Sequence, residues 1–296
     1  MALATFLVAF QTKLIYPADF PAGSREHVDN PAKYELPYED VTLTTPDGVK
    51  VRGYYIRPMM EDDLDTAALD RRPTLLYLHA NAGNMGHRLP IAEILYRTLR
   101  CNIFMLSYRG YGLSEGSPSE KGMRIDAQTA LDYLKSHPAC QDRKIIVYGQ
   151  SIGGAVTIDL VARNQDRIAA MMVENTFLSL PELIPSVMPG LRHFTFLCHQ
   201  RWPSAKSLAT VRGDMPMLFL SSKRDELIPP AHMRGLYEAA VNAATAKKSD
   251  SDPTHRVWRE FAAGTHNDAP MQPGYFDAIH TFWRDEIKWP PTGSLP

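Results

Sequence analysis

The five residues GQSIG, Gly149 to Gly153, indicate the fold of this chain more directly than any other stretch. The apolar run Ile145 to Tyr148 precedes them, and the segment Ala155 to Ile158 that follows is typical of a helix. A serine between two glycines at such a junction indicates a very sharp turn, because Cβ atoms on its neighbours would collide with the strand or the helix. The turn exposes the hydroxyl of Ser151 at a helix N-terminus, where N–H groups favour negative charge.

The rest of the chain alternates apolar strands with amphipathic segments. We predict strands at 41–44, 49–55, 74–78, 103–106, 145–148, 168–173, 217–220 and within 256–261, and helices at 89–99, 120–134 and 275–287. The turn Pro46-Asp47-Gly48 between the first two strands predicts an antiparallel hairpin. This alternation predicts an α/β fold with a mostly parallel, twisted sheet of about eight strands and helices on both faces.

The composition is that of an ordinary globular protein. The 296 residues are 44% hydrophobic and 22% charged, and the net charge is −1. No basic stripe is present in the sequence, so nucleic acid is not an expected partner. Cys101, Cys140 and Cys198 have neither disulfide-framework spacing nor a zinc pattern, so we predict free, packed thiols. We predict a lead-in segment, residues 1–35, and one domain, residues 36–296.

The N-terminus, Met1 to Phe10, is apolar but shorter than the roughly 20 residues that cross a bilayer. It lacks the basic residues and the clear cleavage site of a signal peptide. Three interpretations stay open: a helix that docks on the fold, a shallow membrane-surface anchor, or the remnant of a longer spanning segment. In the second of these, residues 1–16 contact a membrane surface.

A serine nucleophile needs a general base within hydrogen-bond reach, and the base needs an anion to orient it. In folds with this serine turn the chain order is serine, acid, histidine. Asp225 follows the predicted strand 217–220 and is the preferred acid, with Glu226 and Asp214 as alternatives. His266 lies in a turn between the last strand and the last helix and is the preferred base. The other downstream histidines are His232, His255 and His280.

The loop 79–84 (HANAGN), directly after the third strand, is expected to complete an oxyanion site. Its small residues let the backbone approach a substrate closely. We predict the backbone N–H groups of Asn81 and Ile152 as the two donors, and losing one such donor typically costs about 3 kcal/mol. His79 is expected to form a hydrogen bond within the loop and shape it, rather than to act as a base.

The segment 176–208 lies between two predicted strands and is rich in large apolar residues. Two interpretations stay open: a helix packed on the core, or a short lid that lines an acyl pocket over the active site. The predicted pocket residues are Phe177, Leu180, Met188 and Trp202. Two polar stretches, 60–72 and 244–254, are predicted to be loops.

With these residues in place, the chain resembles the serine hydrolases of the fungal bud-emergence family, whose animal counterpart is α/β-hydrolase domain-containing protein thirteen. The resemblance covers most of the chain, and its longest motif, Ser107 to Glu120, is highly specific. The matching stretches are KLIYP (13–17), HANAGNMGHRLP (79–90), SYRGYGLSEGSPSE (107–120), GQSIGGA (149–155), ENTF (174–177) and GTHND (264–268).

The resemblance implies an α/β-hydrolase fold with Ser151 as nucleophile, Asp225 as acid and His266 as base, and no metal or organic cofactor. The sequence departs from the family pattern at Ala80, where glycine is expected. Since alanine permits fewer backbone conformations, a different seating of the oxyanion loop is an open alternative. Family members usually carry a membrane-spanning segment, which implies association with the endoplasmic reticulum or another endomembrane. A soluble cytoplasmic protein is the alternative.

These features predict a serine hydrolase that cleaves carboxylic esters or acyl thioesters through an acyl-Ser151 intermediate. A related branch of the fold removes palmitoyl groups from proteins, so an acylated protein is a candidate partner besides a small or lipid-like acyl substrate. One alternative is an acyltransferase or peptidase with the same triad. Another is a membrane-associated scaffold that retains the hydrolase fold.

Overall fold

The computed structural model describes residues 2–57, 72–246 and 255–289. The predicted loop at 60–72 lies almost entirely outside these ranges, as does most of the predicted loop at 244–254. Residues 244–246 are an exception, because they end a helix instead of opening a loop. Ala240 and Ala244 are buried against the core, which extends the helix through these positions.

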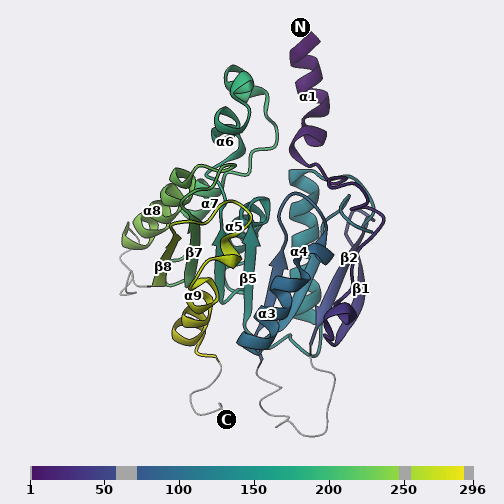
Figure 1. Ribbon diagram of the computed structural model, residues 1–296, viewed down its shortest axis with the longest axis vertical. Coiled ribbons are helices and arrows are strands. Elements are labelled where there is room, and N and C mark those ends of the chain that lie inside the picture. The colour runs from purple at the N-terminus through teal and green to yellow at the C-terminus, as the bar shows by residue number, and fades with distance from the viewer. Residues whose placement is uncertain (1, 58–71, 247–254, 290–296) are drawn as a thin grey trace, which may run out of the picture.

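An eight-stranded sheet forms the centre of the described part of the chain (Figure 1). Its order is β1-β2-β4-β3-β5-β6-β7-β8, with antiparallel pairing from β1 through β2 to β4 and parallel pairing elsewhere. The predicted fold class and hairpin are therefore confirmed. The strands are β1 (Tyr38–Thr44), β2 (Lys50–Ile56), β3 (Thr74–Leu78), β4 (Asn102–Ser107), β5 (Ile145–Gln150), β6 (Ala170–Glu174), β7 (Met217–Ser222) and β8 (Arg256–Phe261).

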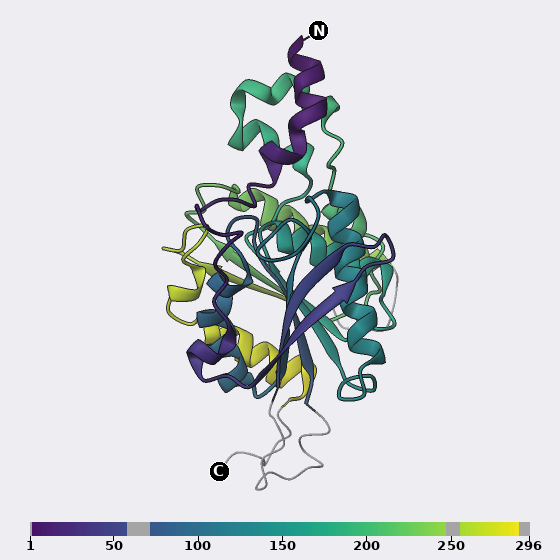
Figure 2. The ribbon, with the colours of Figure 1, turned by 90° about the vertical axis from the view of Figure 1, so that its right-hand side faces the viewer.

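Helices cover both faces of the sheet, which stands between them in Figure 2. Alternate side chains of each strand enter opposite cores: Leu76 and Leu78 of β3 pack into one, Leu75 and Tyr77 into the other. This period of two explains why the parallel strands are continuous apolar runs. One core includes α4 (Glu120–Ser136), α5 (Ile152–Arg163) and α8 (Pro230–Ala246); the other includes α3 (Leu89–Leu99) and α9 (Tyr275–Phe282), which continues as a π-helical turn, Trp283–Ile287.

The segment 176–208 is divided between both of its predicted interpretations. The helix α6 (Leu180–Val187) and the 3₁₀ helix η3 (Pro189–Leu197) stand beyond the carboxyl edge of the parallel strands (Figures 1 and 2). The short helix α7 (Ser204–Leu208) instead packs against α5 and α8. Only the first part of the segment is therefore placed as a lid would be.

The N-terminal helix α1 (Ala2–Ile15) stands beside α6 and η3 at the same end of the molecule (Figure 2). The side chain of Gln11 links them, because it donates to the carbonyl of Leu197 at 3.3 Å and accepts from the N–H groups of His199 and Gln200. Among the described residues, no helix has both the length and the apolar character that crossing a bilayer requires.

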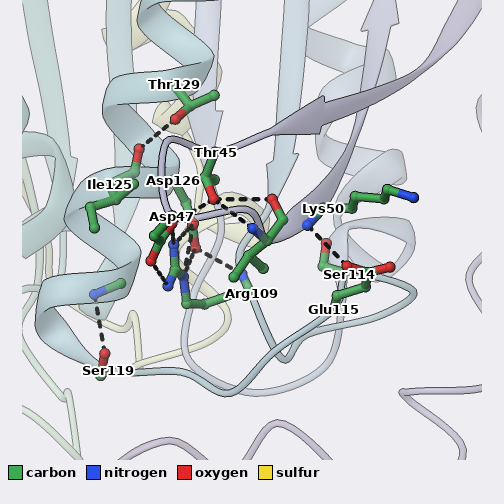
Figure 3. A network of polar contacts seen from close by, with 12 residues as sticks. Thr45, Asp47, Lys50, Arg109, Ser114, Glu115, Ser119, Ile125, Asp126 and Thr129 are labelled. Atoms are coloured by element: carbon green, nitrogen blue, oxygen red, sulfur yellow. Dashed lines mark hydrogen bonds and ion pairs between the residues drawn. The ribbon is translucent and has the colours of Figure 1, made fainter.

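The long motif 107–120 is anchored by the buried guanidinium of Arg109 (Figure 3). It donates to Asp47 in the β1–β2 turn at 2.8 Å and to Asp126 of α4 at 2.9 Å. The backbone N–H of Arg109 also donates to Asp126, which is fully buried. This network ties the hairpin, the motif and α4 together, and so fixes the stretch that bonds to the loop 79–84.

Candidate active site

Ser151 occupies the turn between β5 and α5 in a strained backbone conformation, with φ 56° and ψ −123°. The two flanking glycines are required by close contacts. A Cβ atom on Gly149 would lie 2.1 Å from the carbonyl oxygen of Gly153, and one on Gly153 would lie 2.1 Å from that of Leu78. The turn predicted from the GQSIG stretch is thus present, and it places the serine at the first turn of α5.

The three predicted triad side chains come from different loops and meet at the carboxyl edge of the sheet. His266 Nε2 lies 3.1 Å from Ser151 Oγ, and His266 Nδ1 lies 2.8 Å from Asp225 Oδ2. The other carboxylate oxygen of Asp225 accepts from the backbone N–H groups of Leu227 and Ile228. Because a carboxylate can only accept, Nδ1 carries the proton and Nε2 is free to accept one from the serine.

The alternative acids and bases lie elsewhere. Glu226 accepts from the backbone N–H of His266 at 3.1 Å but does not contact its ring, and Asp214 pairs with Arg212. His232 Nδ1 accepts from the N–H of Leu178, and His255 pairs with Glu286. The remaining candidate, His280, lies within α9.

Asn81, in the loop after β3, lines an apolar cavity that Ser151 also lines. Among the described residues, the N–H groups of Asn81 and Ile152 donate no hydrogen bond. The Asn81 side chain is held from two sides, by Tyr111 Oη at 2.6 Å and by the carbonyl of Ile15 at 2.5 Å. Ala80 is outside the positive-φ region, so alanine fits this loop without the strain that a glycine-only conformation would impose.

His79 shapes this loop, as the sequence analysis predicted. Its ring is buried, and Nδ1–H donates to the carbonyl of Ala80 at 2.7 Å. Tyr108 Oη donates to the His79 carbonyl. Burial lowers the pKa of His79 from 6.5 to about 3, so the ring is neutral near neutral pH.

An apolar cavity of about 420 Å³ opens beside Ser151 and His266. Phe177, Leu180 and Met188 line it, as predicted. Trp202 does not. Its buried indole N–H donates to Tyr16 Oη at 2.9 Å, so the ring packs where the N-terminal segment meets the lid segment.

The helix α1 contributes a cavity wall that the sequence analysis missed. Leu7, Gln11, Leu14 and Ile15 line the cavity. Their spacing of four, three and one residues places them on one face of a helix, so periodicity within 1–16 was an available signal. Among residues 2–57, 72–246 and 255–289, no group of three or more histidine, cysteine or acidic side chains is arranged to hold a metal ion.

Comparison with known proteins identifies the family. Residues 73–195 match the family model described as the alpha/beta hydrolase fold. Protein bem46 of Schizosaccharomyces pombe is 46% identical over 278 residues, which cover 94% of this chain and 87% of that protein. The chain belongs to the Bem46 family of α/β hydrolases. The predicted resemblance is thereby confirmed.

A second curated relative and a solved structure are also similar to this chain. A Saccharomyces cerevisiae relative named uncharacterized membrane protein YNL320W is 38% identical over 286 residues, covering 95% of this chain and 93% of that protein. The structure of the Pyrococcus furiosus esterase Pf2001 has the same fold, with a TM-score of 0.66 and 18% identity over 87% of this chain and 94% of its own. Family and fold together support a hydrolase.

The neutral, buried His79 predicts a pH dependence of stability. Between pH 6.5 and about 3 the unfolded state binds a proton at this ring that the folded state does not. The free energy of unfolding should therefore fall as the pH falls through this window, by up to about 1.4 kcal/mol per pH unit. Urea unfolding at about pH 7 and about pH 5 should show a smaller fall for His79→Gln than for wild type. The same substitution at the exposed His27 is the control, and an equal fall for all three proteins would contradict this account.

Proposed function

We propose that this protein is a serine hydrolase that cleaves carboxylic esters or acyl thioesters through an acyl-Ser151 intermediate. The observation that carries the proposal is the hydrogen-bonded series Asp225, His266 and Ser151, of which His266 and Ser151 line an apolar cavity. A nucleophile and an oriented base that both line an acyl-sized apolar cavity are the parts that this chemistry needs.

The proposed first step forms the acyl-enzyme. Ser151 Oγ attacks the acyl carbon while His266 Nε2 takes its proton, and the carbonyl π electrons move onto oxygen. The resulting anion accepts hydrogen bonds from the N–H groups of Asn81 and Ile152, which have no other acceptor among the described residues. Collapse breaks the bond to the leaving oxygen or sulfur, which receives the proton from His266.

The second step releases the acid. His266 accepts a proton from water, the water oxygen attacks the acyl carbon, and Ser151 leaves with the returned proton. Asp225 stabilises the imidazolium in both steps, and its own position is fixed by the two backbone N–H groups that it accepts from. An acyltransferase or peptidase would share the first step and differ in the acceptor or leaving group.

The apolar walls of the cavity favour an acyl chain as the part of the substrate that binds there. Its walls are mainly leucine, isoleucine, valine, methionine and phenylalanine side chains from α1, α6 and η3. A sugar or a peptide backbone would leave polar groups without partners in such walls, whereas an aliphatic chain would not. Acyl esters and S-acyl groups on proteins both satisfy this requirement.

The mechanism predicts which residues are needed for labelling by a fluorophosphonate probe. Wild type should be labelled, and Ser151→Ala and His266→Ala should not. Asp225→Asn should lower kcat for a short ester by about 10⁴-fold, because the base would be held in the wrong tautomer. Ser221→Ala is a matched control, since Ser221 is also buried and its hydroxyl has no partner among the described residues.

Labelling of Ser151→Ala, or a folded wild-type protein that the probe does not label, would contradict the proposed mechanism. If wild type is labelled, partition of the acyl group between water and added alcohols or amines would separate a hydrolase from an acyltransferase. The retained-scaffold alternative requires wild type to be unreactive.

The cavity predicts a dependence on acyl chain length. Met188→Trp adds bulk to the wall and should lower kcat/KM for long-chain p-nitrophenyl esters by about ten-fold relative to the acetyl ester. Phe196→Trp is the control, because Phe196 is exposed on η3. A uniform effect on all chain lengths in Met188→Trp would argue against an acyl pocket at this position.

We also propose that the end formed by α1, α6 and η3 contacts a membrane surface. Several large apolar side chains are exposed there, including Phe6, Phe10, Val187 and Phe196. Buried together in an interface they would favour binding, since each buried CH₂ contributes about 0.8 kcal/mol. The acyl chain of a membrane substrate would then enter the cavity beside these helices, and the name of the yeast relative is consistent with this location.

Vesicle sedimentation tests this contact. Wild type should sediment with phosphatidylcholine vesicles, and the double variant Phe6→Asp/Phe10→Asp should lose most of the binding without losing activity on a soluble short ester. Met271→Asp is the control, because Met271 is exposed on the 3₁₀ helix Ala269–Met271, outside α1 and the lid. Equal sedimentation of the double variant would disprove the proposed surface.

A further inference from the structure

The tetrapeptide Glu174 to Phe177 (ENTF) begins at the last residue of β6 and continues into the loop beyond it, and the mechanism above leaves most of it without a role. We infer that this segment positions the catalytic residues, with Thr176 holding the nucleophile turn and Asn175 holding the loop of the base. The inference rests on the proposed function. It assigns Asn175 and Thr176 as positioning residues, since neither is expected to contact substrate.

The backbone of Ser151 is bonded to this segment on both of its polar groups. Its N–H donates to the carbonyl of Glu174 at 2.9 Å, and its carbonyl accepts from Thr176 Oγ1 at 2.7 Å. Both polar groups of the strained residue are therefore bonded to the same segment. A Cβ atom on Gly154 would lie 2.6 Å from Thr176 Cβ, so this glycine is what lets the threonine approach.

Asn175 connects the loop of His266 to the end of β7. The side-chain amide of Asn175 is buried and donates to the carbonyls of Thr265 and His266 at 3.3 and 3.2 Å. It also donates to Ser222 Oγ and accepts from the Ser222 N–H at 2.8 Å. Ser222 ends β7, and Asp225 follows in the next loop. One amide thus joins the segment that carries the acid to the residue that is the base.

Glu174 bonds to the start of α9, the helix that follows the His266 loop. The carboxyl group of Glu174 is fully buried and accepts hydrogen bonds from Tyr148 at 2.7 Å and from Tyr275. Tyr275 begins α9, which follows the His266 loop. Residues 174 and 175 therefore hold this loop at His266 and at its exit, while residue 176 holds the serine.

This arrangement favours a positioning role over general stabilisation. The three catalytic groups come from three loops, and residues 174–176 bond to the serine turn, to the end of β7 and to the His266 loop. Catalysis tolerates only small errors in the separation of these groups. A misplacement of about 1 Å can reduce the rate by about 100-fold. A hydrogen bond to the carbonyl of Ser151 orients the backbone that carries Oγ, and through it affects the distance between Oγ and His266.

Thr176→Val tests the inference with little change in shape. It removes the hydroxyl that bonds to Ser151 and should lower kcat by about ten-fold, with KM unchanged. Thr176→Ser retains the hydroxyl and should restore most of the activity. Thr74→Val is the matched control, because Thr74 is buried at the start of β3, away from the carboxyl edge that carries Ser151, and its hydroxyl has no partner among the described residues.

Asn175→Asp tests the link to the base. It replaces the amide donor with an oxygen that faces two carbonyls, and kcat should fall by about 100-fold. Asn164→Asp is the control for a buried asparagine away from the site; its amide donates to Gln128 and the Leu160 carbonyl.

Hydrogen exchange provides a readout that does not need activity. In Thr176→Val, amide exchange should rise in peptides that contain Ser151 relative to Thr74→Val, and in Asn175→Asp it should rise in peptides that contain His266. Equal exchange and equal kcat in Thr176→Val and Thr74→Val would overturn the inference. Failure of wild type to react with the fluorophosphonate would instead overturn the proposed function, while the exchange comparison would still decide the positioning role.

Discussion

The close approach of the α5 N-terminus to the ends of β3 and β5 is the constraint on which the rest of the site depends. Gly149 and Gly153 allow backbone contacts that any Cβ atom would prevent, and the strained angles of Ser151 follow from them. This geometry directs the hydroxyl toward the cavity at the carboxyl edge of the sheet, where His266 reaches it from the loop after β8 and Asp225 reaches His266 from the loop after β7. Asp225, His266 and Ser151 can therefore meet although they are distant in sequence.

A second set of contacts connects the site to the N-terminal helix. Asn81 is held between Tyr111 of the 107–120 motif and the carbonyl that ends α1, and Trp202 donates to Tyr16 just beyond that helix. The loop 79–84, the cavity wall and the lid thus share α1 as a common support. Arg109 anchors the stretch 107–120, and its tyrosines, Tyr108 and Tyr111, bond to the loop 79–84.

Much of the fold and of the site was predictable from local patterns. Continuous apolar runs specified the parallel strands, and glycine spacing specified the serine turn, because both depend on short-range sterics. Chain order and loop position selected Asp225 and His266 over their neighbours. The prediction for Trp202 was wrong because an apolar residue in a lid segment can face either the cavity or the N-terminal segment that packs against the lid. Its N–H needed an acceptor, and Tyr16 lies 186 residues away.

The sequence by itself determined the α/β class, the nucleophile turn and the identity of the acid and base candidates, since these follow from residue type, spacing and order. Only the tertiary structure decided which surfaces enclose the cavity, which side chain secures Asn81, and that residues 174–177 touch both the serine turn and the loop of His266. The physical reason is that hydrogen bonds and packing between distant segments depend on how the strands are ordered in space, which local periodicity does not encode.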